Sequence, residues 1–142
     1  MDGKTVKGFS MMKILVVDDM MTMRHVITHM LRDLGYTSID EACDGMQALQ
    51  MINKKVYDLV ITDFYMPNLD GQQLLKKIRS QKETQDLPVL MVSCVDNKEK
   101  IKAIIACKVT GFIVKPFCSN TLKNKLNRIK STFTRPAEIV LG

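Results

Sequence analysis

The chain has 142 residues, 46% of them hydrophobic and 25% charged, with a formal net charge of +6. This length fits one domain, and a domain of this size buries enough surface to fold without disulfides or metal staples. No apolar run approaches the roughly 20 residues of a membrane helix, and we expect neither membrane insertion nor a secretory signal. The composition also excludes a disordered, collagen-like or coiled-coil chain.

The cysteines and histidines do not form the spacing of a zinc site. The four cysteines are far apart and none forms C-x-x-C: Cys43, Cys94, Cys107 and Cys118. Scattered cysteines of this kind are typical of reduced thiols, so we expect a cytoplasmic protein. His25 and His29 lie four residues apart but lack a third ligand, and we expect them to be exposed or partly packed.

The chain alternates between short apolar runs and segments with helical spacing of apolar residues. After a polar lead-in at residues 1–11, the predicted strands are Lys13–Val17, Ser38–Ala42, Asp58–Thr62, Val89–Val92 and Phe112–Val114. The predicted helices are Met20–Leu34, Met46–Asn53, Gly71–Ser80, Lys98–Cys107 and Ser119–Ser131. Residues 132–142, which include Pro136, are predicted to leave the last helix as a tail. Five alternations predict an α/β fold, a doubly wound parallel sheet with helices on both faces.

Polar side chains follow four of the five predicted strands. Asp18 and Asp19 follow the first strand, Asp63 the third, Ser93 the fourth and Lys115 the fifth. Ligands of doubly wound folds bind at the carboxyl ends of the strands, so these groups are expected to meet there. A lone aspartate after a strand is usually a helix cap or turn residue, but the joint occurrence indicates a site.

The chemistry of this set favours phosphoryl transfer with a divalent cation. Three crowded carboxylates provide the oxygen ligands that suit Mg²⁺. A carboxylate can attack phosphorus and form an aspartyl-phosphate, while a lysine neutralises the charge of the transferred group. The chain has no glycine-rich phosphate loop, so a nucleoside triphosphate is not the expected donor.

Four short motifs carry a resemblance to a known family: VVDD at Val16–Asp19, DFYMPNLDG at Asp63–Gly71, MVS at Met91–Ser93 and KPF at Lys115–Phe117. On these motifs, residues 12–131 resemble a response-regulator receiver domain. Single-domain chemotaxis regulators of this family are the most similar, through Thr22–Arg24, Leu34–Tyr36, Glu41–Gly45 and Gly111–Phe117. The resemblance implies a flavodoxin-like (βα)5 fold with strand order 2-1-3-4-5.

The resemblance also implies a role for each site residue. Asp63 would accept the phosphoryl group. Asp19, Asp63 and the backbone carbonyl of Tyr65 would hold Mg²⁺, and Asp18 would act through a metal-bound water. Lys115 would pair with the phosphoryl group, preceding a cis peptide bond to Pro116.

Two further residues would form the switch that the resemblance implies. Ser93 would hydrogen-bond the phosphoryl group and move inward on activation, and Phe112 would turn inward behind it. Phosphorylation would shift a pre-existing equilibrium, and an output face would report it. The expected partner face comprises Lys98, Ile101, Ile105, Phe112 and Lys125.

The implied partners are a sensor histidine kinase, whose phosphohistidine donates to Asp63, and a protein target, the flagellar motor switch. A phosphatase is a further implied partner, and we expect a monomer without external substrate turnover. Between Lys98 and Arg135 ten basic residues face only one acidic residue, Glu99. This charge fits either a solvated surface or an acidic partner.

The sequence departs from the chemotaxis pattern at a few positions. Phe112 replaces the usual tyrosine and lacks its hydroxyl, and Lys108 replaces a usual glycine, where a positive φ would strain a lysine. Tyr65 and Val95 are expected to flank the phosphoryl position, and we hypothesise that they screen the phosphate from water.

Three other functions remain open from the sequence. A paralogue could use the same chemistry to drain phosphate from the kinase or to serve a pathway without a motor. A phosphatase acting on external substrates would need an efficient base, and the residue two positions after Asp63 is Tyr65 rather than a carboxylate. Nucleic-acid binding is suggested only by the basic C-terminal stretch and lacks a base-reading motif, so it is not expected.

Overall fold

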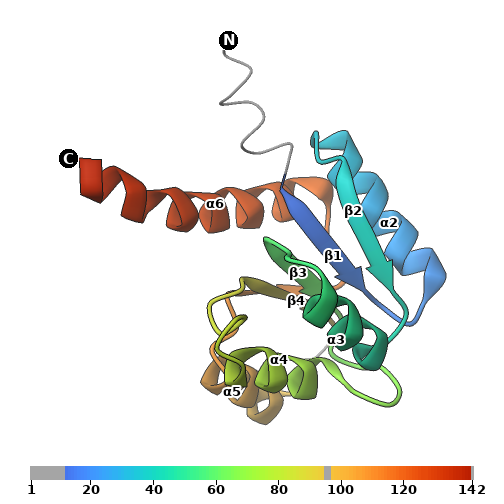
Figure 1. Ribbon diagram of the computed structural model, residues 1–142. Helices are drawn as coiled ribbons and strands as arrows, with labels where there is room; N and C mark the ends of the chain where they lie inside the picture. The colour runs from blue at the N-terminus through green and yellow to red at the C-terminus, as the bar shows by residue number, and fades with distance from the viewer. Residues whose placement is uncertain (1–11, 95–96, 142) are drawn as a thin grey trace.

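The structure is a computed structural model that describes residues 12–94 and 97–141, with side chains for residues 12–94 and 97–131. Five parallel strands form one sheet in the order β2-β1-β3-β4-β5. The strands are β1 (Lys13–Val17), β2 (Ser38–Ala42), β3 (Leu59–Thr62), β4 (Val89–Ser93) and β5 (Gly111–Val114). The helices are α2 (Met21–Asp33), α3 (Gly45–Lys54), α4 (Gly71–Ser80), α5 (Lys98–Ala106) and α6 (Ser119–Leu141). The predicted fold class and strand order are confirmed (Figure 1).

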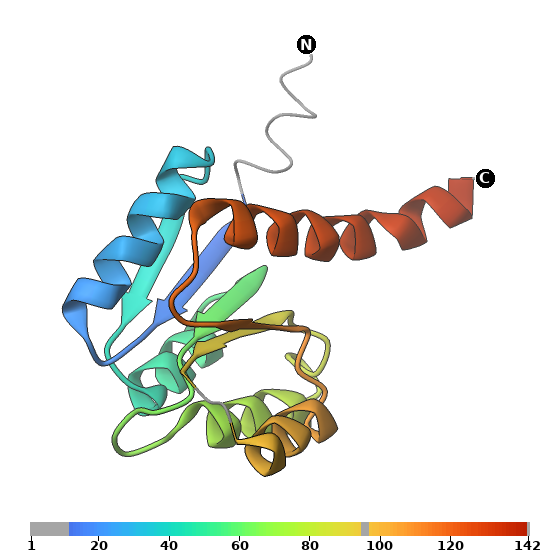
Figure 2. The ribbon, with the colours of Figure 1, turned by 180° about the vertical axis from the view of Figure 1, so that it is seen from behind.

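The sheet separates two hydrophobic clusters because successive side chains of a strand point to opposite faces. On β1, Leu15 and Val17 join the cluster beneath α3, α4 and α5. Ile14 and Val16 join the cluster beneath α2 and α6 on the other face. The ribbon shows this layering from both sides (Figures 1 and 2). Because the central strands are covered on both faces, they carry nearly continuous apolar runs, as the sequence predicted.

The turn after β3 leaves no room for a side chain where α4 begins. The N–H of Gly71 donates to the carbonyl oxygen of Phe64 at 2.7 Å. A Cβ atom on Gly71 would collide with the carbonyl oxygen of Asp63 and lie 2.9 Å from the Sδ atom of Met91. Asp70 caps α4 and forms a capping box with Gln73, which also ties this turn to the helix. The turn that carries Asp63 is therefore tightly packed against α4.

The last helix differs from its prediction. We expected α6 to end at Ser131, with a tail that contains Pro136. In the structure α6 continues to Leu141 and extends beyond the edge of the sheet (Figures 1 and 2). The prediction was wrong because it treated the proline as a helix end, whereas a helix can pass a proline at the cost of one backbone hydrogen bond. Within the described part of the chain, no helix has the length and apolarity to cross a membrane.

Special backbone geometry occurs at Gly35, at Lys108 and between Lys115 and Pro116, and the cis bond before Pro116 is the one that the resemblance implied. Gly35 follows α2 with a φ of 101°, and the N–H of Tyr36 donates to the carbonyl of Leu31, which closes the helix in a Schellman motif. The peptide bond from Lys115 to Pro116 is cis. Lys108, in the turn after α5, has a φ of 65°, a conformation that glycine adopts with less strain.

Replacement of Lys108 by glycine is expected to stabilise the protein. Relief of the left-handed strain should exceed the extra entropy of the unfolded glycine, giving a net gain of about 0.5–1 kcal/mol in the free energy of unfolding. Lys102→Gly is the matched control, because Lys102 is exposed within α5 and a helical glycine should cost about 1 kcal/mol. Urea denaturation measures both variants, and a destabilised Lys108→Gly protein would contradict the expectation.

Candidate functional site

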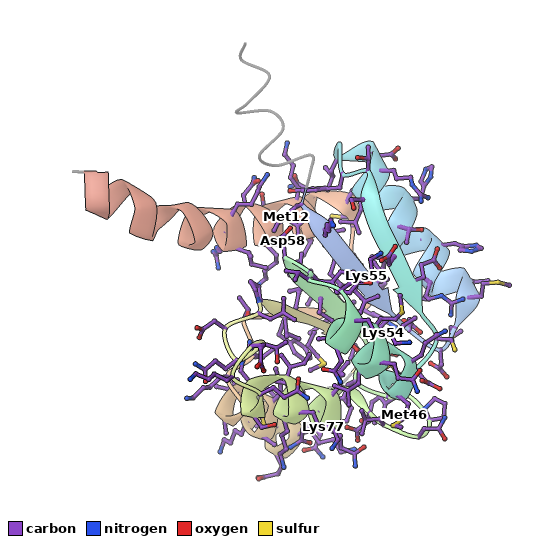
Figure 3. All side chains as sticks on the ribbon, viewed as in Figure 1. Met12, Met46, Lys54, Lys55, Asp58 and Lys77 are labelled. Carbon is purple, nitrogen blue, oxygen red and sulfur yellow. The ribbon has the colours of Figure 1, made fainter. Side chains whose placement is uncertain are left out.

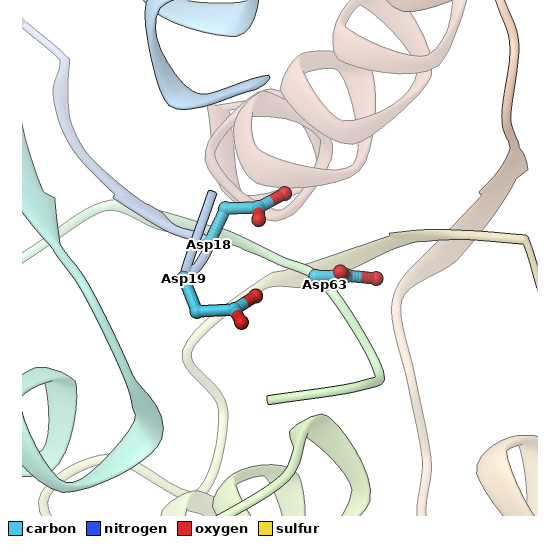
Figure 4. Close-up of side chains that lie close together, drawn as sticks. All are labelled: Asp18, Asp19 and Asp63. Carbon is cyan, nitrogen blue, oxygen red and sulfur yellow. The ribbon is translucent and has the colours of Figure 1, made fainter. Parts of the chain in front are cut away.

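Three carboxylates meet at the carboxyl ends of β1 and β3. The register pairs Val17 with Thr62, so the residues that follow these two lie side by side. The N–H of Asp63 donates to the carbonyl of Val17 at 3.0 Å, which joins the two strand ends. One carboxylate oxygen each from Asp18, Asp19 and Asp63 lies within 4.8 Å of the other two (Figure 4). The parallel sheet thus brings together residues that lie 45 positions apart.

Lys115 adds a positive charge, on a side chain that is 9% exposed, to this cluster. Its Nζ atom lies 3.3 Å from Oδ2 of Asp18 and 3.5 Å from Oδ2 of Asp63. The N–H of Lys115 donates to the carbonyl of Ser93 at 3.0 Å, so the end of β5 is fixed against the end of β4. Lys115 thus pairs with two of the three carboxylates, Asp18 and Asp63.

Burial and charge crowding disfavour ionisation of Asp18. Its side chain is 1% exposed, and desolvation is the main cause that raises its pKa above 3.8. The Asp63 carboxylate raises this pKa further, whereas the N–H of Met20 and the ammonium of Lys115 lower it. The N–H of Met20 donates to Oδ1 of Asp18 at 2.9 Å. The cluster is therefore an arrangement that another cation would stabilise.

Asp63 has one oxygen held by the backbone and the other directed to Lys115. The N–H of Phe64 donates to Oδ1 of Asp63 at 2.7 Å, while Oδ2 is the atom nearest the ammonium of Lys115. The side chain is 9% exposed, so only a small part of the carboxylate is open to solvent. This arrangement orients the carboxylate before any ligand arrives.

Ser93 carries a hydroxyl group without a partner. The side chain is fully buried at the end of β4, and its Oγ atom makes no hydrogen bond among the described residues. A buried hydroxyl in this state costs about 1–3 kcal/mol. Register places Ser93 next to Val114 of β5, immediately before Lys115, at the edge that holds the carboxylates. An acceptor group bound at this edge would satisfy the hydroxyl.

The structure places Tyr65 beside an open hollow of about 380 Å³ that Asp19, Met66, Pro67 and Asp70 also line. Its side chain is 48% exposed. Val95, the other residue expected to screen the site, lies outside the described residues. Cys94 is exposed next to Ser93. His25 and His29 are exposed on α2, as expected, and neither belongs to the carboxylate cluster among the described residues.

The residues expected to form the partner face lie on three elements. Lys98, Ile101 and Ile105 belong to α5, Phe112 to β5 and Lys125 to α6. Ile105 is 62% exposed, while Ile101 and Phe112 are half-buried against the cluster beneath α3, α4 and α5. The face therefore combines exposed apolar surface with positive charge.

Two cationic residues of the site were missed by the sequence analysis. Arg24 donates to the carbonyl of Asp18 at 2.7 Å and pairs with Glu41 at 3.0 Å, which braces the acidic turn. Lys100 lies over the rings of Phe64 and Tyr65. Neither has a local signal beyond its charge, because their side-chain partners, Glu41 for Arg24 and Tyr65 for Lys100, lie 17 and 35 residues away.

Comparison with known proteins agrees with this geometry. The family model described as the response regulator receiver domain matches residues 14–127. Chemotaxis protein CheY-3 of Vibrio cholerae is 48% identical over 118 residues, which cover 83% of this chain and 91% of that protein. Chemotaxis protein CheY of Pseudomonas aeruginosa is 42% identical over 118 residues, with coverage of 83% and 95%.

Solved structures give the same result. CheY4 of Vibrio cholerae is 36% identical with a TM-score of 0.77, over 83% of this chain and 98% of that one. The receiver domain of sensor histidine kinase PA1611 from Pseudomonas aeruginosa PAO1 was solved with a magnesium ion coordinated in its active-site cleft. It is 29% identical with a TM-score of 0.77, over 84% of this chain and 98% of that one. This chain, with its carboxylate cluster and adjoining lysine, belongs to the response regulator receiver domain family.

Proposed function

We propose that Asp63 accepts a phosphoryl group from the phosphohistidine of a sensor kinase, with Mg²⁺ as cofactor, and that the modified protein signals by binding another protein. The observation that carries the proposal is the carboxylate cluster, with Asp18 and Asp63 buried, which adjoins the Lys115 ammonium at the sheet edge where the unpartnered Ser93 hydroxyl also lies. Carboxylate, cation and hydroxyl donor together suit a phosphoryl group better than any neutral ligand.

The donor set fits Mg²⁺. Carboxylate oxygens are hard ligands, and this ion binds through one or two of them while it keeps several waters. Asp19, Asp63 and the backbone carbonyl of Tyr65 would hold it directly, and Asp18 through a water. When bound, the ion supplies positive charge that offsets the charge of the phosphoryl oxygens. The magnesium in the cleft of the PA1611 receiver domain supports this assignment.

The residues of the chain divide the chemistry among them. A carboxylate oxygen of Asp63 forms the bond to phosphorus as the bond from phosphorus to the kinase histidine breaks, and the departing ring nitrogen takes a proton from solvent. The Lys115 ammonium pairs with a phosphoryl oxygen, because it already lies 3.5 Å from the accepting carboxylate. The hydroxyl of Ser93 donates to another oxygen, which removes the cost of its burial without a partner.

The output is proposed to pass through Ser93 and Phe112 to the partner face. Movement of Ser93 toward the phosphoryl group would vacate space behind β4, and the register places Phe112 beside Met91 of that strand. Phe112 is half-buried, so both an inward and an outward ring position are open to it. The target would then bind Lys98, Ile101, Ile105, Phe112 and Lys125.

The flagellar motor switch is the proposed target, supported by the chemotaxis proteins among the relatives. The alternative is a paralogue that drains phosphate from the kinase or serves a pathway without a motor. Phe112 is the observation that favours this alternative, since its ring lacks the hydroxyl that could bind a partner. Turnover of an external substrate is not proposed, because Tyr65 stands where a second carboxylate base would be placed.

Phosphorylation of Asp63 is expected to add the mass of one phosphoryl group. The protein would be incubated with Mg²⁺ and acetyl phosphate and measured by intact mass spectrometry. Asp63→Asn is the control, because its amide is a poor nucleophile and cannot form the acyl phosphate. No mass gain in wild type with Mg²⁺ bound, or an equal gain in both proteins, would contradict the proposal.

The target can be tested by titrating the protein with a peptide from a flagellar motor switch protein. Phosphorylation is expected to strengthen binding by at least about tenfold, equivalent to about 1.4 kcal/mol of coupling. Ile105→Ala should weaken binding of the phosphorylated form by several-fold, because exposed apolar area is lost from the face. Equal affinity with and without phosphate would favour the paralogue that drains phosphate.

Asp18→Asn is expected to stabilise the protein in the absence of metal. The raised pKa means that the folded protein binds a proton more tightly than the unfolded chain, so this carboxylate lowers stability as pH rises above about 4. In EDTA at pH 7 the variant should gain on the order of 1 kcal/mol in the free energy of unfolding. Added Mg²⁺ should then stabilise wild type more than the variant.

Urea denaturation with and without Mg²⁺ measures both effects. Asp33→Asn is a suitable control, since that carboxylate is exposed on α2 away from the cluster. A variant less stable than wild type in EDTA would show that the ion pair with Lys115 outweighs burial and repulsion at Asp18.

A further inference from the structure

Lys100 holds the two aromatic residues that follow the phosphoacceptor. Its Nζ atom lies 4.8 Å from the ring centroid of Tyr65 and 5.5 Å from that of Phe64. It also donates to the hydroxyl oxygen of Tyr65 at 3.3 Å. The two rings meet edge to face with centroids 4.9 Å apart. An ammonium over aromatic rings is attracted by their quadrupoles, so these contacts restrict the rings.

The Tyr65 ring lies beside an open hollow that Asp19, an exposed member of the acidic cluster, also lines. That cluster includes Asp63. A tyrosine that is 48% exposed on a loop would otherwise exchange rotamers within nanoseconds. The contact with Lys100 therefore favours one position of the Tyr65 ring beside the hollow.

The backbone of Lys100 is held in place by the N-terminal cap of α5. The side chain of Asn97 caps α5 and accepts hydrogen bonds from the N–H groups of Glu99 and Lys100 at 2.8 and 3.2 Å. The backbone of Lys100 is thus anchored in the first turn of α5, while its side chain crosses to the loop after β3. Lys102 is two residues further along the helix, on the opposite side, and is exposed.

We propose that Lys100 is a positioning residue that keeps the Tyr65 ring beside this hollow and thereby slows the loss of phosphate from Asp63. The inference rests on the proposed function. In the step concerned, a water oxygen bonds to phosphorus and the bond from phosphorus to the Asp63 oxygen breaks. The carboxylate is regenerated, and both protons of the water leave with the phosphate as H2PO4⁻. A ring held at the hollow reduces the access of that water.

The test follows phosphate loss in four single variants and one double variant. Each protein is phosphorylated with acetyl phosphate and Mg²⁺, separated rapidly from the donor, and followed by intact mass. Lys100→Met keeps the length of the side chain without its charge, and loss should be roughly two- to fivefold faster than in wild type. Lys102→Met is the matched control and should leave the rate unchanged. Lys100→Arg should keep the wild-type rate, because a guanidinium also stacks on aromatic rings.

A double variant separates positioning from direct electrostatics. Tyr65→Ala should itself speed phosphate loss, and adding Lys100→Met to it should have no further effect, because the charge acts through the ring. An undiminished effect of Lys100→Met in the Tyr65→Ala background would overturn the proposal, since the charge would then act on the phosphate directly. An unchanged or slower rate in Lys100→Met alone would also overturn it. Failure of wild type to take up phosphate would instead count against the proposed function and, with it, this inference.

Discussion

The crowding of three carboxylates around one ammonium is the constraint on which the rest of the structure depends. Asp18 and Asp63 are buried, and Lys115 lies 3.3 and 3.5 Å from their oxygens. Burial of charged groups lowers the stability of the folded state because the groups lose their hydration. The sheet must therefore be stable enough to hold them together. The central strands provide that stability, because clusters on both faces bury their apolar side chains. Figure 3 draws the described side chains on the ribbon. The site thus lowers the stability of the folded protein, and the two hydrophobic clusters offset this loss.

Rigidity is distributed unevenly around this site. The turn after Asp63 is packed so closely against α4 that Gly71 has no space for a Cβ atom. In contrast, α5 has one fully buried side chain, Ile104, and the partner face lies largely on this helix. An element with little buried surface is the kind that can shift at low cost. The carboxylate of Asp63, the proposed acceptor, is therefore held firmly, while the surface proposed to report phosphorylation is held loosely.

Most of the fold was predictable from local pattern. The strands Lys13–Val17 and Ser38–Ala42 and the helix Gly71–Ser80 have the bounds that were predicted, since apolar runs, caps and turns are local signals. Strand order came from the resemblance and not from periodicity, because pairing between distant strands leaves no local trace. The end of α6 was missed, since the proline at position 136 is compatible with both a helix end and a continuing helix. Helix bounds are the least certain feature of any such pattern.

The sequence by itself determined the residue types of the site and their place after the strands. Parallel strands share one direction, so whatever follows them must gather at one edge. Only the tertiary structure decided which side chains meet. Lys115 pairs with both Asp18 and Asp63, and Lys100 contacts Tyr65. The hydroxyl of Ser93 has no hydrogen-bond partner among the described residues. These features depend on the packing of side chains 35 and 97 residues apart, and sequence periodicity holds no information about such separations.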